Sequence, residues 1–542
     1  MPEADKRAQE WIKKFDKAKS NRVNWDRYWK EISEYFIPRK SDVYGAHVSG
    51  QKKEQYLYDS TSVHAAELLA SALHGMLTNP ALTWFGLTTG DEKLDSQKKV
   101  KEWLQFAVTR MIQVLNNSNF QTEIHELYLD LVNLGTGLMS VDKDDRTIVC
   151  FKTQPIYEAY ILENNKGTAD SVFSETEWTV KQIVDEFGEK VVAEKMPDLL
   201  DKLKQDPEFK EKLIHMVFPR NYDSESRVPK KMKFASITIS RRHQQVIRES
   251  GFRQCKYVAP RWTKISGEAY GRSPAMKCLA DVKTLNVMMS SMLKATQLRA
   301  FPPVLASDDG LLSPVRFTPG GATYTRGGTK DRVEVLNITG DLATNDKIMN
   351  DIRLQIQKTF FIDQLQLTTE SKYQTATEVN HRAEEQLRML SPILGRLHNE
   401  LLKPIIDRVF EIMLDAGEFG VIPGELSKKK LEIQYTSQIS KAQRVSEADV
   451  FPRMLGVIGP IVEAKPEMLD NINGDELLRY YAGLFNLPSK ILYDKTEVEI
   501  KRDERAKQAA MAQQVAMESH NAEVSSKVAP NLLKAQEMQR GQ

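Results

Sequence analysis

The fold class is decided by residues 271–303, GRSPAMKCLADVKTLNVMMSSMLKATQLRAFPP. Ser273 is a residue type that caps helix N-termini, Pro274 suits a first helical turn, and Pro302 with Pro303 stops a helix. Apolar residues recur between these signals every three or four positions, at Cys278, Val282, Leu285, Met289 and Met292. The pattern therefore predicts one uninterrupted helix over 273–300, about 40 Å long at 1.5 Å per residue.

A second amphipathic segment follows over 342–362. Its apolar face is formed by Ile348, Ile352, Ile356 and Phe360, and its charged residues lie elsewhere around the helix. The intervening residues, 301–341, are rich in Pro and Gly turn formers and contain one short strand pattern at 333–336. Two helices flanking a compact insert predict a rod with a tip, and an ordinary loop elaboration remains the alternative for the insert.

Residues 1–272 combine helical and strand patterns, which indicates an α+β region. Helical spacing predicts helices at 5–37, 59–78, 93–115, 119–135, 179–187 and 190–214. Short β-branched or aromatic runs predict strands at 147–151, 233–239 and 254–258.

The C-terminal third returns to helices after a polar segment at 363–374. Thr375 and Glu378 have capping-box spacing and begin a helix that ends near Gly417, with bends expected at Pro392 and Pro404. A strand is predicted at 431–435 and helices at 475–484 and 498–519. The last of these is polar almost all round, so we expect it to need partners or to remain partly frayed.

The composition describes a folded protein without strong charge bias. The 542 residues are 41% hydrophobic, and 76 Lys and Arg balance 74 Asp and Glu. The chain lacks the strong positive bias of proteins that grip nucleic acid through many phosphate contacts, and its charge alone does not decide whether it meets DNA. Three separated cysteines suggest no disulfide framework or zinc site and fit a reducing cytoplasm. We expect no signal peptide and no membrane span.

No motif for catalysis survives inspection, so we expect no enzyme, cofactor or metal. A phosphate loop ending in Gly-Lys-Ser/Thr is absent, and 327–330 has the composition in the wrong order. Residues 271–275 lack the closing glycine of a nucleophile elbow, and 142–145 lack the glycine and glutamate of a calcium loop. His125-Glu126 lacks the second histidine of a zinc-protease motif.

Several strings, in order, carry a resemblance to a known family. The first is Trp25-Asp-Arg-Tyr-Trp-Lys-Glu-Ile-Ser-Glu-Tyr-Phe-Ile-Pro-Arg39, followed by Tyr58-Asp-Ser-Thr61. Residues 65–77 and 83–85 continue the series, followed by Leu131-Val-Asn-Leu-Gly-Thr-Gly-Leu138, Ala269-Tyr-Gly-Arg-Ser-Pro274 and Thr375-Ala-Thr-Glu-Val-Asn380. Over residues 20–415 the chain resembles the portal, or head-to-tail connector, proteins of short-tailed phages (podoviruses).

The resemblance implies a mainly helical α+β portal-type fold with an α/β wing, a two-helix stem, a small β-containing clip and a helical C-terminal crown. The wing would comprise 1–272 and 376–445, the latter a long bent helix and a strand. The stem helices would be 273–300 and 342–362, on either side of a clip at 301–341. A tunnel loop would occupy 363–375, and the crown and C-terminal tail 446–542.

The resemblance also implies a function that lies in geometry. The chain would form a ring, a dodecamer in the family pattern, at one capsid vertex of the virion after assembly in the host bacterial cytoplasm. Double-stranded DNA would enter through it, driven by the terminase large subunit, and leave through a short tail. Its other partners would be the major capsid and scaffolding proteins and the tail adaptor or tail tube proteins, with no membrane involved.

Candidate DNA-facing residues follow from segment position in the family. They are Gln364, Gln366, Lys372 and Tyr373 in the tunnel loop; Lys283, Lys294 and Arg299 in the stem; and Arg316, Arg326 and Lys330 in the clip. Met288, Met289 and Met292 suit packing between subunits or within one subunit. The alternative function is a different multimeric DNA-handling factor, such as a scaffold or a nuclease subunit.

Overall fold

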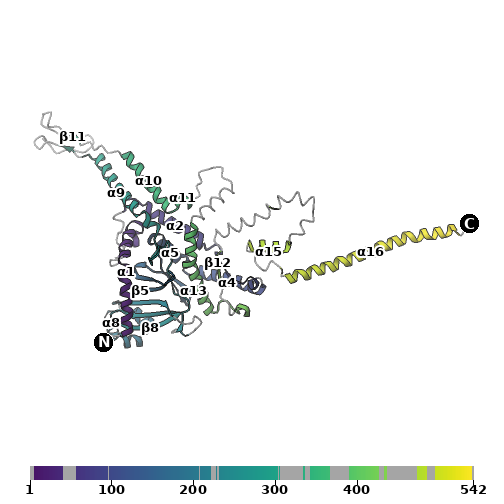
Figure 1. Cartoon of the computed structure of the whole chain (residues 1–542), viewed down its shortest axis with the longest axis horizontal. Helices are drawn as coiled ribbons and strands as arrows, with labels where there is room; N and C mark the ends of the chain where they lie inside the picture. The colour runs from purple at the N-terminus through teal and green to yellow at the C-terminus, as the bar shows by residue number, and fades with distance from the viewer. Residues whose placement is uncertain are drawn as a thin grey trace. The chain divides into compact units, whose positions relative to one another are not determined.

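The computed structural model describes most of the chain in two compact units. The described residues are 5–40, 57–95, 97–206, 208–220, 228, 231–302, 304–305, 334–335, 342–365, 390–426, 432–435, 454, 473–484, 493 and 495–539. The first unit comprises Met1–Gly86, Ala107–Val421 and Ile433–Ala442, and the second comprises Leu87–Phe106, Ile422–Glu432 and Gln443–Gln542. Figure 1 labels their elements.

The described helices and strands alternate through the first half of the chain and become helical later. Up to residue 258 they are α1 (Lys6–Phe36), α2 (Thr61–Leu77), β1 (Phe85–Thr88), α3 (Glu92–Asp95), α4 (Lys98–Asn117), α5 (Phe120–Leu134), β2 (Met139–Asp144), β3 (Ile148–Thr153), β4 (Ala159–Glu163), β5 (Ala169–Thr179), α6 (Val180–Phe187), α7 (Glu189–Lys195), α8 (Pro197–Gln205), β6 (Lys210–Pro219), β7 (Phe234–Ser240), β8 (Gln245–Phe252) and β9 (Tyr257–Val258). Beyond it they are α9 (Pro274–Ala300), β10 (Val304–Leu305), β11 (Glu334–Val335), α10 (Leu342–Thr359), α11 (Ile362–Leu365), α13 (Lys403–Asp415), β12 (Glu432–Tyr435), α15 (Gly474–Leu484) and α16 (Lys495–Gln539).

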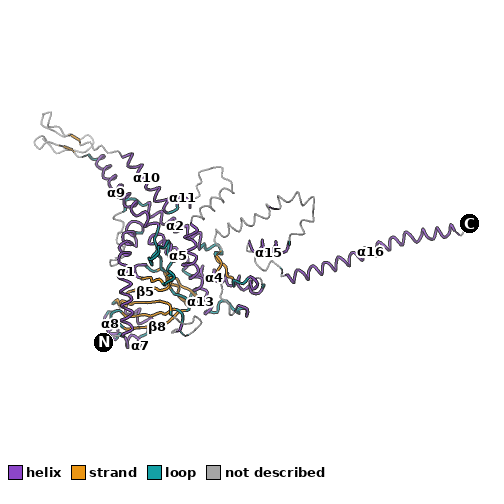
Figure 2. The backbone as a smooth tube through the Cα atoms, in the orientation of Figure 1, coloured by secondary structure: helices purple, strands orange, loops and turns teal. Residues whose placement is uncertain are grey.

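The first unit is built around an antiparallel sheet of order β4-β5-β6-β7-β8, whose strands are orange in Figure 2. The sequence patterns indicated only β7 among these strands. Ser174, His215 and Thr238 are consecutive partners across the middle of the sheet. The half-buried His215 ring forms hydrogen bonds through both nitrogens, to the Tyr257 hydroxyl at 2.7 Å and the Ser236 hydroxyl at 2.9 Å. Each ring nitrogen therefore has a hydrogen-bond partner, which removes the cost of placing a polar ring away from water.

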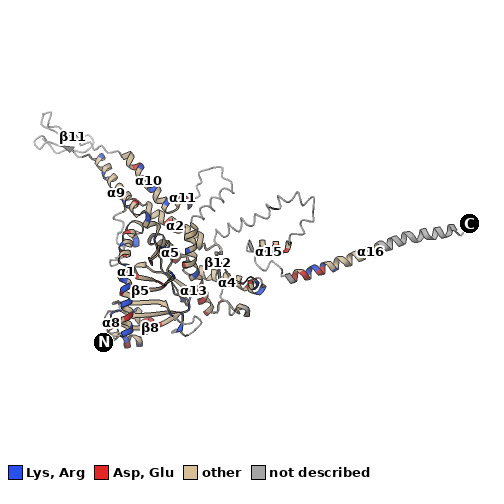
Figure 3. Cartoon of the chain, viewed as in Figure 1, with Lys and Arg blue, Asp and Glu red and all other residues tan. Residues whose placement is uncertain are grey.

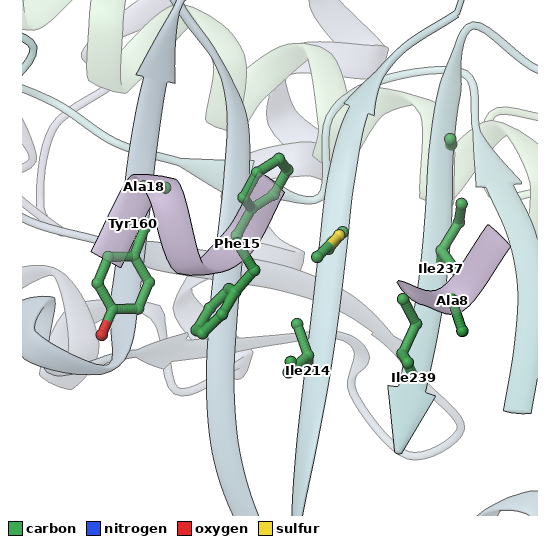
Figure 4. Close-up of a cluster of buried hydrophobic side chains, with 10 residues drawn as sticks. Ala8, Phe15, Ala18, Tyr160, Ile214, Ile237 and Ile239 are labelled. Carbon is green, nitrogen blue, oxygen red and sulfur yellow. The ribbon is translucent and has the colours of Figure 1, made fainter. Parts of the chain in front are cut away.

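Helix α1 covers one face of this sheet. Ala8, Phe15 and Ala18 are spaced at helical intervals and point from α1 into a cluster with sheet residues, which Figure 4 shows. The sheet contributes Tyr160, Phe173, Ile214, Met216, Ala235, Ile237 and Ile239. The apolar stripe of α1 is therefore what joins the N-terminal helix to the sheet.

The predicted helix over 190–214 is wrong in its second half. Pro197 begins a new helix after α7, and α8 ends at Gln205. Lys210–Pro219 form strand β6, in which Lys210 and Lys212 are exposed while Glu211 and Leu213 are buried. Alternation with period two places Leu213 in the cluster that α6, α7 and α8 form over the sheet, and this burial outweighs the helical propensity of the lysines.

A smaller sheet of order β3-β2-β9 and a layer of helices complete the first unit. Helix α5 ends at Gly135, which adopts a left-handed φ of +77°. A glycine in this conformation is a common end of a helix, because it has no Cβ to clash there. The mixture of antiparallel sheets and a majority of helices confirms the predicted mainly helical α+β class.

The long C-terminal helix of the first unit is described from residue 390 and is interrupted once. A π turn at His398–Leu402 immediately precedes α13, and Pro404 lies in the first turn of α13. The predicted irregularity at Pro404 is thus confirmed. Gly417 has a φ of +76° and follows the helix, as predicted for a C′ residue.

In the second unit, α15 and α16 are the long described helices. The predicted helix at 498–519 extends in both directions, over Lys495–Gln539. Arg502 of α16 and Asp475 of α15 form two hydrogen bonds of 2.6 Å between exposed side chains. Such an exposed pair adds little to stability.

Candidate functional site: the α9–α10 hairpin and its base

Helix α9 starts as the sequence predicts. The Ser273 hydroxyl accepts a hydrogen bond from the Met276 N–H at 3.1 Å, and Pro274 occupies the first helical position. The same hydroxyl donates to the Asn133 carbonyl at 2.7 Å, near the end of α5. One serine therefore caps α9 and fastens it to a neighbouring helix.

Two glycines let the backbone segments at this base approach closely. A Cβ atom at Gly271 would lie 2.9 Å from the Arg261 Cβ and nearer still to the Gly135 carbonyl oxygen. The Gly271 N–H donates to the Thr136 hydroxyl at 2.8 Å. Only glycine fits such an approach, so residues 131–138 and 269–274, far apart in sequence, meet here.

The N-terminal helix joins the same base. The Trp29 indole N–H donates to the Leu134 carbonyl at 3.0 Å, and the Tyr28 hydroxyl donates to the Met276 carbonyl at 3.1 Å. The Trp29 ring meets the Tyr270 ring edge to face at 5.1 Å. Three of the sequence strings that carried the resemblance thus converge on the first turn of α9.

Higher along the hairpin, an ion pair and an amide lock α9 and α10 to the start of α2. The buried Asp59 carboxylate accepts from Arg353 of α10, at 2.9 Å from Nε and 2.8 Å from Nη2. The Asn286 side-chain oxygen accepts from the N–H groups of Tyr58 and Asp59 at 2.7 and 3.1 Å. We call Asp59, Asn286 and Arg353 the hairpin lock.

The electrostatics of the hairpin lock favour a charged Asp59. Burial alone would raise the pKa of Asp59, but the hydrogen bonds from Thr61 and Arg353 and the Arg353 charge outweigh it, so the pKa lies below its ordinary value. The sequence analysis missed these roles. The available signal was Asn286, a polar residue beside the apolar positions Val282 and Leu285.

Burial decreases along α9 from base to tip. All of its buried side chains lie between Pro274 and Asn286, and the side chains beyond Asn286 are half-buried or exposed. Val287 is 67% exposed, Leu298 42% and Phe301 79%. On α10, Ile348 is exposed while Ile356 is buried, as is Phe360 just after the helix, so the predicted apolar face is not packed along its whole length in one copy of the chain. Met349 is buried in its place, which shows that the packed stripe shifts by one position near the tip.

The three methionines Met288, Met289 and Met292 are all half-buried in the single chain. The predicted short strand at 333–336 is described at Glu334–Val335, where β11 pairs antiparallel with β10. Helix α9 ends at Ala300, before the two prolines, as predicted. Figure 1 shows α9 and α10 side by side, in agreement with their packing, with the two short strands beyond them.

The predicted stem residues are all on α9. Lys283 forms an ion pair with Glu31 of α1. Lys294 and Arg299 are exposed on the outer half of the helix, and Figure 3 colours the basic residues of this hairpin blue.

The other predicted site residues cannot be located in the same way. Gln364 lies in α11, with its side chain outside the described residues. Gln366, Lys372, Tyr373, Arg316, Arg326 and Lys330 lie outside the described residues altogether.

Two further properties concern the described part of the chain alone. None of its helices has both the length and the apolar composition needed to cross a bilayer. Its His, Cys, Asp and Glu side chains form no group of three or more placed to hold a metal ion.

Comparison with known proteins identifies relatives over nearly the whole length. A probable portal protein of Bordetella phage BPP-1 is 30% identical over 529 residues, which cover 95% of this chain and 94% of that protein. The portal protein of Salmonella phage epsilon15 is 28% identical over the same shares of both chains. The portal protein of Enterobacteria phage T3 is 24% identical over 201 residues, 37% of each chain.

These relatives give no support to the alternative of a scaffold or nuclease subunit. The model of one protein family, described as bacteriophage head to tail connecting protein, matches residues 8–492. The chain belongs to this family of bacteriophage head to tail connecting proteins.

Proposed function

We propose that the chain is the portal protein of a short-tailed phage, a ring at one capsid vertex through which DNA is packaged and later ejected. The observation that carries the ring is the apolar surface on the outer half of the α9–α10 hairpin. A single copy leaves Val287, Leu298 and Phe301 of this hairpin exposed, together with Ile348 and Leu354. Several large apolar side chains exposed on one hairpin support an interaction site there.

A ring requires heterologous contacts, in which one face of each subunit meets a different face of the next. Val287 and Leu298 are eleven residues apart, which is three helical turns plus about 20°, so they share one face of α9. We propose that a neighbouring copy covers this face. The rigid α9 and α10 of successive copies would then form the channel wall as the stem, with the tip as the clip and α16 in the crown.

The assembly test uses a double substitution on this face. Val287→Glu with Leu298→Glu places two charges where the neighbour would pack, so we expect ring formation to be lost. The control is Val421→Glu, because Val421 is even more exposed, at 92%, and lies off the hairpin. Negative-stain electron microscopy and light scattering measure the outcome. Rings of normal size from the double variant would refute this interface.

DNA passage and its partners form the finer part of the proposal. In this reading, a terminase large subunit drives DNA inward, and capsid, scaffolding and tail proteins bind the outer surfaces. Twelve copies per ring follow the family pattern. The channel would be lined by the candidates of the tunnel loop, Gln364, Gln366, Lys372 and Tyr373, with Lys283 and Arg299 along the stem and Arg316, Arg326 and Lys330 at the clip. The third stem candidate, Lys294, shares the α9 face of Val287 and Leu298 and would reach the channel from the edge of the subunit contact.

Deletion of residues 365–371 separates the channel role from ring assembly. Rings should still form, because the stem interface is untouched, while packaging or retention of DNA should fail. Particles that package and retain DNA normally with this deletion would exclude the tunnel-loop role.

A further inference from the structure

The helix described over 390–415 carries an unusual turn whose cause is visible in the sequence. In the π turn at His398–Leu402, the Lys403 N–H donates to the His398 carbonyl five residues earlier. Pro404 follows directly. In a regular α-helix the Pro404 ring would clash with the Glu400 carbonyl, and proline has no N–H to donate. The wider turn relieves this conflict, and π turns of this kind are frequent at functional positions.

The π turn directs Glu400 onto Arg261. Oε2 of Glu400 accepts from Arg261 Nε at 3.0 Å and from the Arg261 backbone N–H at 3.1 Å, and Oε1 accepts from Nη2 at 2.8 Å. Charged, multiple hydrogen bonds of this geometry are among the strongest in proteins. One extra residue changes the phase of a helix by roughly 100°, so this contact depends on the register of the turn.

Arg261 is a fully buried cation whose remaining donors are also used. Its Nη1 pairs with Glu163 at the end of β4 and donates to the Ala269 carbonyl at 3.3 Å. Its Nη2 donates to the Gly167 carbonyl at 3.0 Å. A buried charge of this kind tolerates poorly the loss of one partner, because the others cannot replace it.

The backbone around Arg261 is part of the base of α9. The next residue, Trp262, donates its N–H to the Gly135 carbonyl at 2.9 Å. Arg261 itself forms an isolated bridge with Thr136, whose hydroxyl accepts from Gly271. Gly271 stands two residues before the Ser273 cap. Any displacement of Arg261 is therefore transmitted by direct contacts to the first turn of α9.

We propose that Glu400 and Arg261 form a latch that couples the register of the 390–415 helix to the seating of α9. With the π turn in place, the Glu400 carboxylate holds Arg261 in position, and the hydrogen bonds at the base of α9 are intact. A shift of this helix to regular α register withdraws the carboxylate and loosens the base. The latch lies within one copy of the chain and does not depend on the ring proposed above.

The test is hydrogen exchange of the full-length protein, resolved for the α9 amides of residues 276–286. Glu400→Gln keeps the shape but removes one of the two carboxylates that neutralise the buried Arg261, so exchange in this segment should rise about tenfold or more. The matched control is Glu411→Gln. Glu411 lies on the same helix and also pairs with arginines, Arg253 at 3.0 Å and Arg408 at 2.7 Å, but makes no contact with the α9 base among those described here.

A second variant tests the register itself. Deletion of Asn399 together with Pro404→Ala removes the reason for the π turn while retaining Glu400 and Arg261, and it should loosen α9 as Glu400→Gln does. Unchanged α9 exchange in either variant, or an equal rise in the Glu411→Gln control, would overturn the latch.

Amides of β5–β7 report whether each variant remains folded. If Glu400→Gln loses protection there as well, Glu400→Asp takes its place, because aspartate keeps the charge and shortens the reach by one methylene. Faster exchange confined to α9 in that variant supports the latch. Faster exchange throughout the sheet shows that the ion cluster only holds the fold together, and it refutes the coupling.

Discussion

Replacing Asp59 by Asn should weaken the hairpin lock without altering its shape. Asparagine retains an oxygen that can accept from the Thr61 N–H, as Asp59 does at 2.9 Å. What it loses is the negative charge that receives two donors of Arg353, at 2.9 and 2.8 Å. The substitution therefore isolates the charge of one buried carboxylate.

The magnitude follows from these contacts. A hydrogen bond to a charged group contributes about 1.5–3 kcal/mol, and breaking a buried ion pair costs about 3–5 kcal/mol. The Arg353 side chain is 24% exposed and also donates to Asn350 at 2.7 Å, so water and Asn350 recover part of the loss. We expect Asp59→Asn to lower the free energy of unfolding by about 2 kcal/mol at neutral pH.

The deficit must also depend on pH with a definite sign. The pKa of Asp59 is lower in the folded chain than its ordinary value of about 3.9 in an unfolded one. The carboxylate therefore stabilises the fold fully above about pH 4, and this contribution disappears as the pH falls through the lower, folded pKa. The difference between wild type and Asp59→Asn should be constant near neutrality and shrink below about pH 4.

The assay is urea unfolding followed by tryptophan fluorescence at a series of pH values. Asp475→Asn serves as the control, because its Arg502 pair is exposed and its loss should change stability little. A variant as stable as wild type at neutral pH would refute the reasoning. So would a deficit that persists undiminished at pH 3, since it could not arise from the Asp59 charge.

Three further outcomes follow from the same structure. Gly271→Ala should prevent the normal seating of α9, because its Cβ would overlap the Arg261 Cβ and the Gly135 carbonyl, whereas Gly75→Ala, with open space around it, should be tolerated; circular dichroism and thermal unfolding compare the two. Ser273→Ala removes a helix cap and the bond to Asn133, so urea unfolding should show a loss of about 1–2 kcal/mol. Desolvation and the Lys256 and Arg248 charges lower the pKa of His215 to about 3. The neutral ring therefore contributes its full stability above about pH 6.5, and this contribution falls as the pH drops below that value. We expect His215→Gln to flatten this pH dependence when the free energy of unfolding is measured across the acid range.

Local signals in the sequence predicted the elements whose limits depend on near neighbours. Ser273, Pro274 and the two prolines after Phe301 fixed the ends of α9, because caps and proline act within a few residues. The left-handed glycine Gly417 was recognisable as a helix end for the same reason. The order of the family strings indicated the portal class, which the whole-length comparisons confirm.

Contacts between distant residues were not accessible in this way. Strand β6 was predicted as the end of a helix, since its burial in the sheet depends on β5 and β7 rather than on its own lysines. Ile348 belongs to the apolar face predicted for α10, but a repeat of 3.6 residues does not reveal where the packing on that face ends.

The sequence by itself determined the fold class, the two long helices and the family, because periodicity, caps and ordered motifs are properties of the chain alone. Only the tertiary structure decided which charges are paired. It joined Asp59 to Arg353 across 294 positions and Glu400 to Arg261 across 139, and it brought two glycines together at the base of α9. The physical reason is that burial turns a separated carboxylate and guanidinium into an obligatory pair, and burial arises only when distant segments pack.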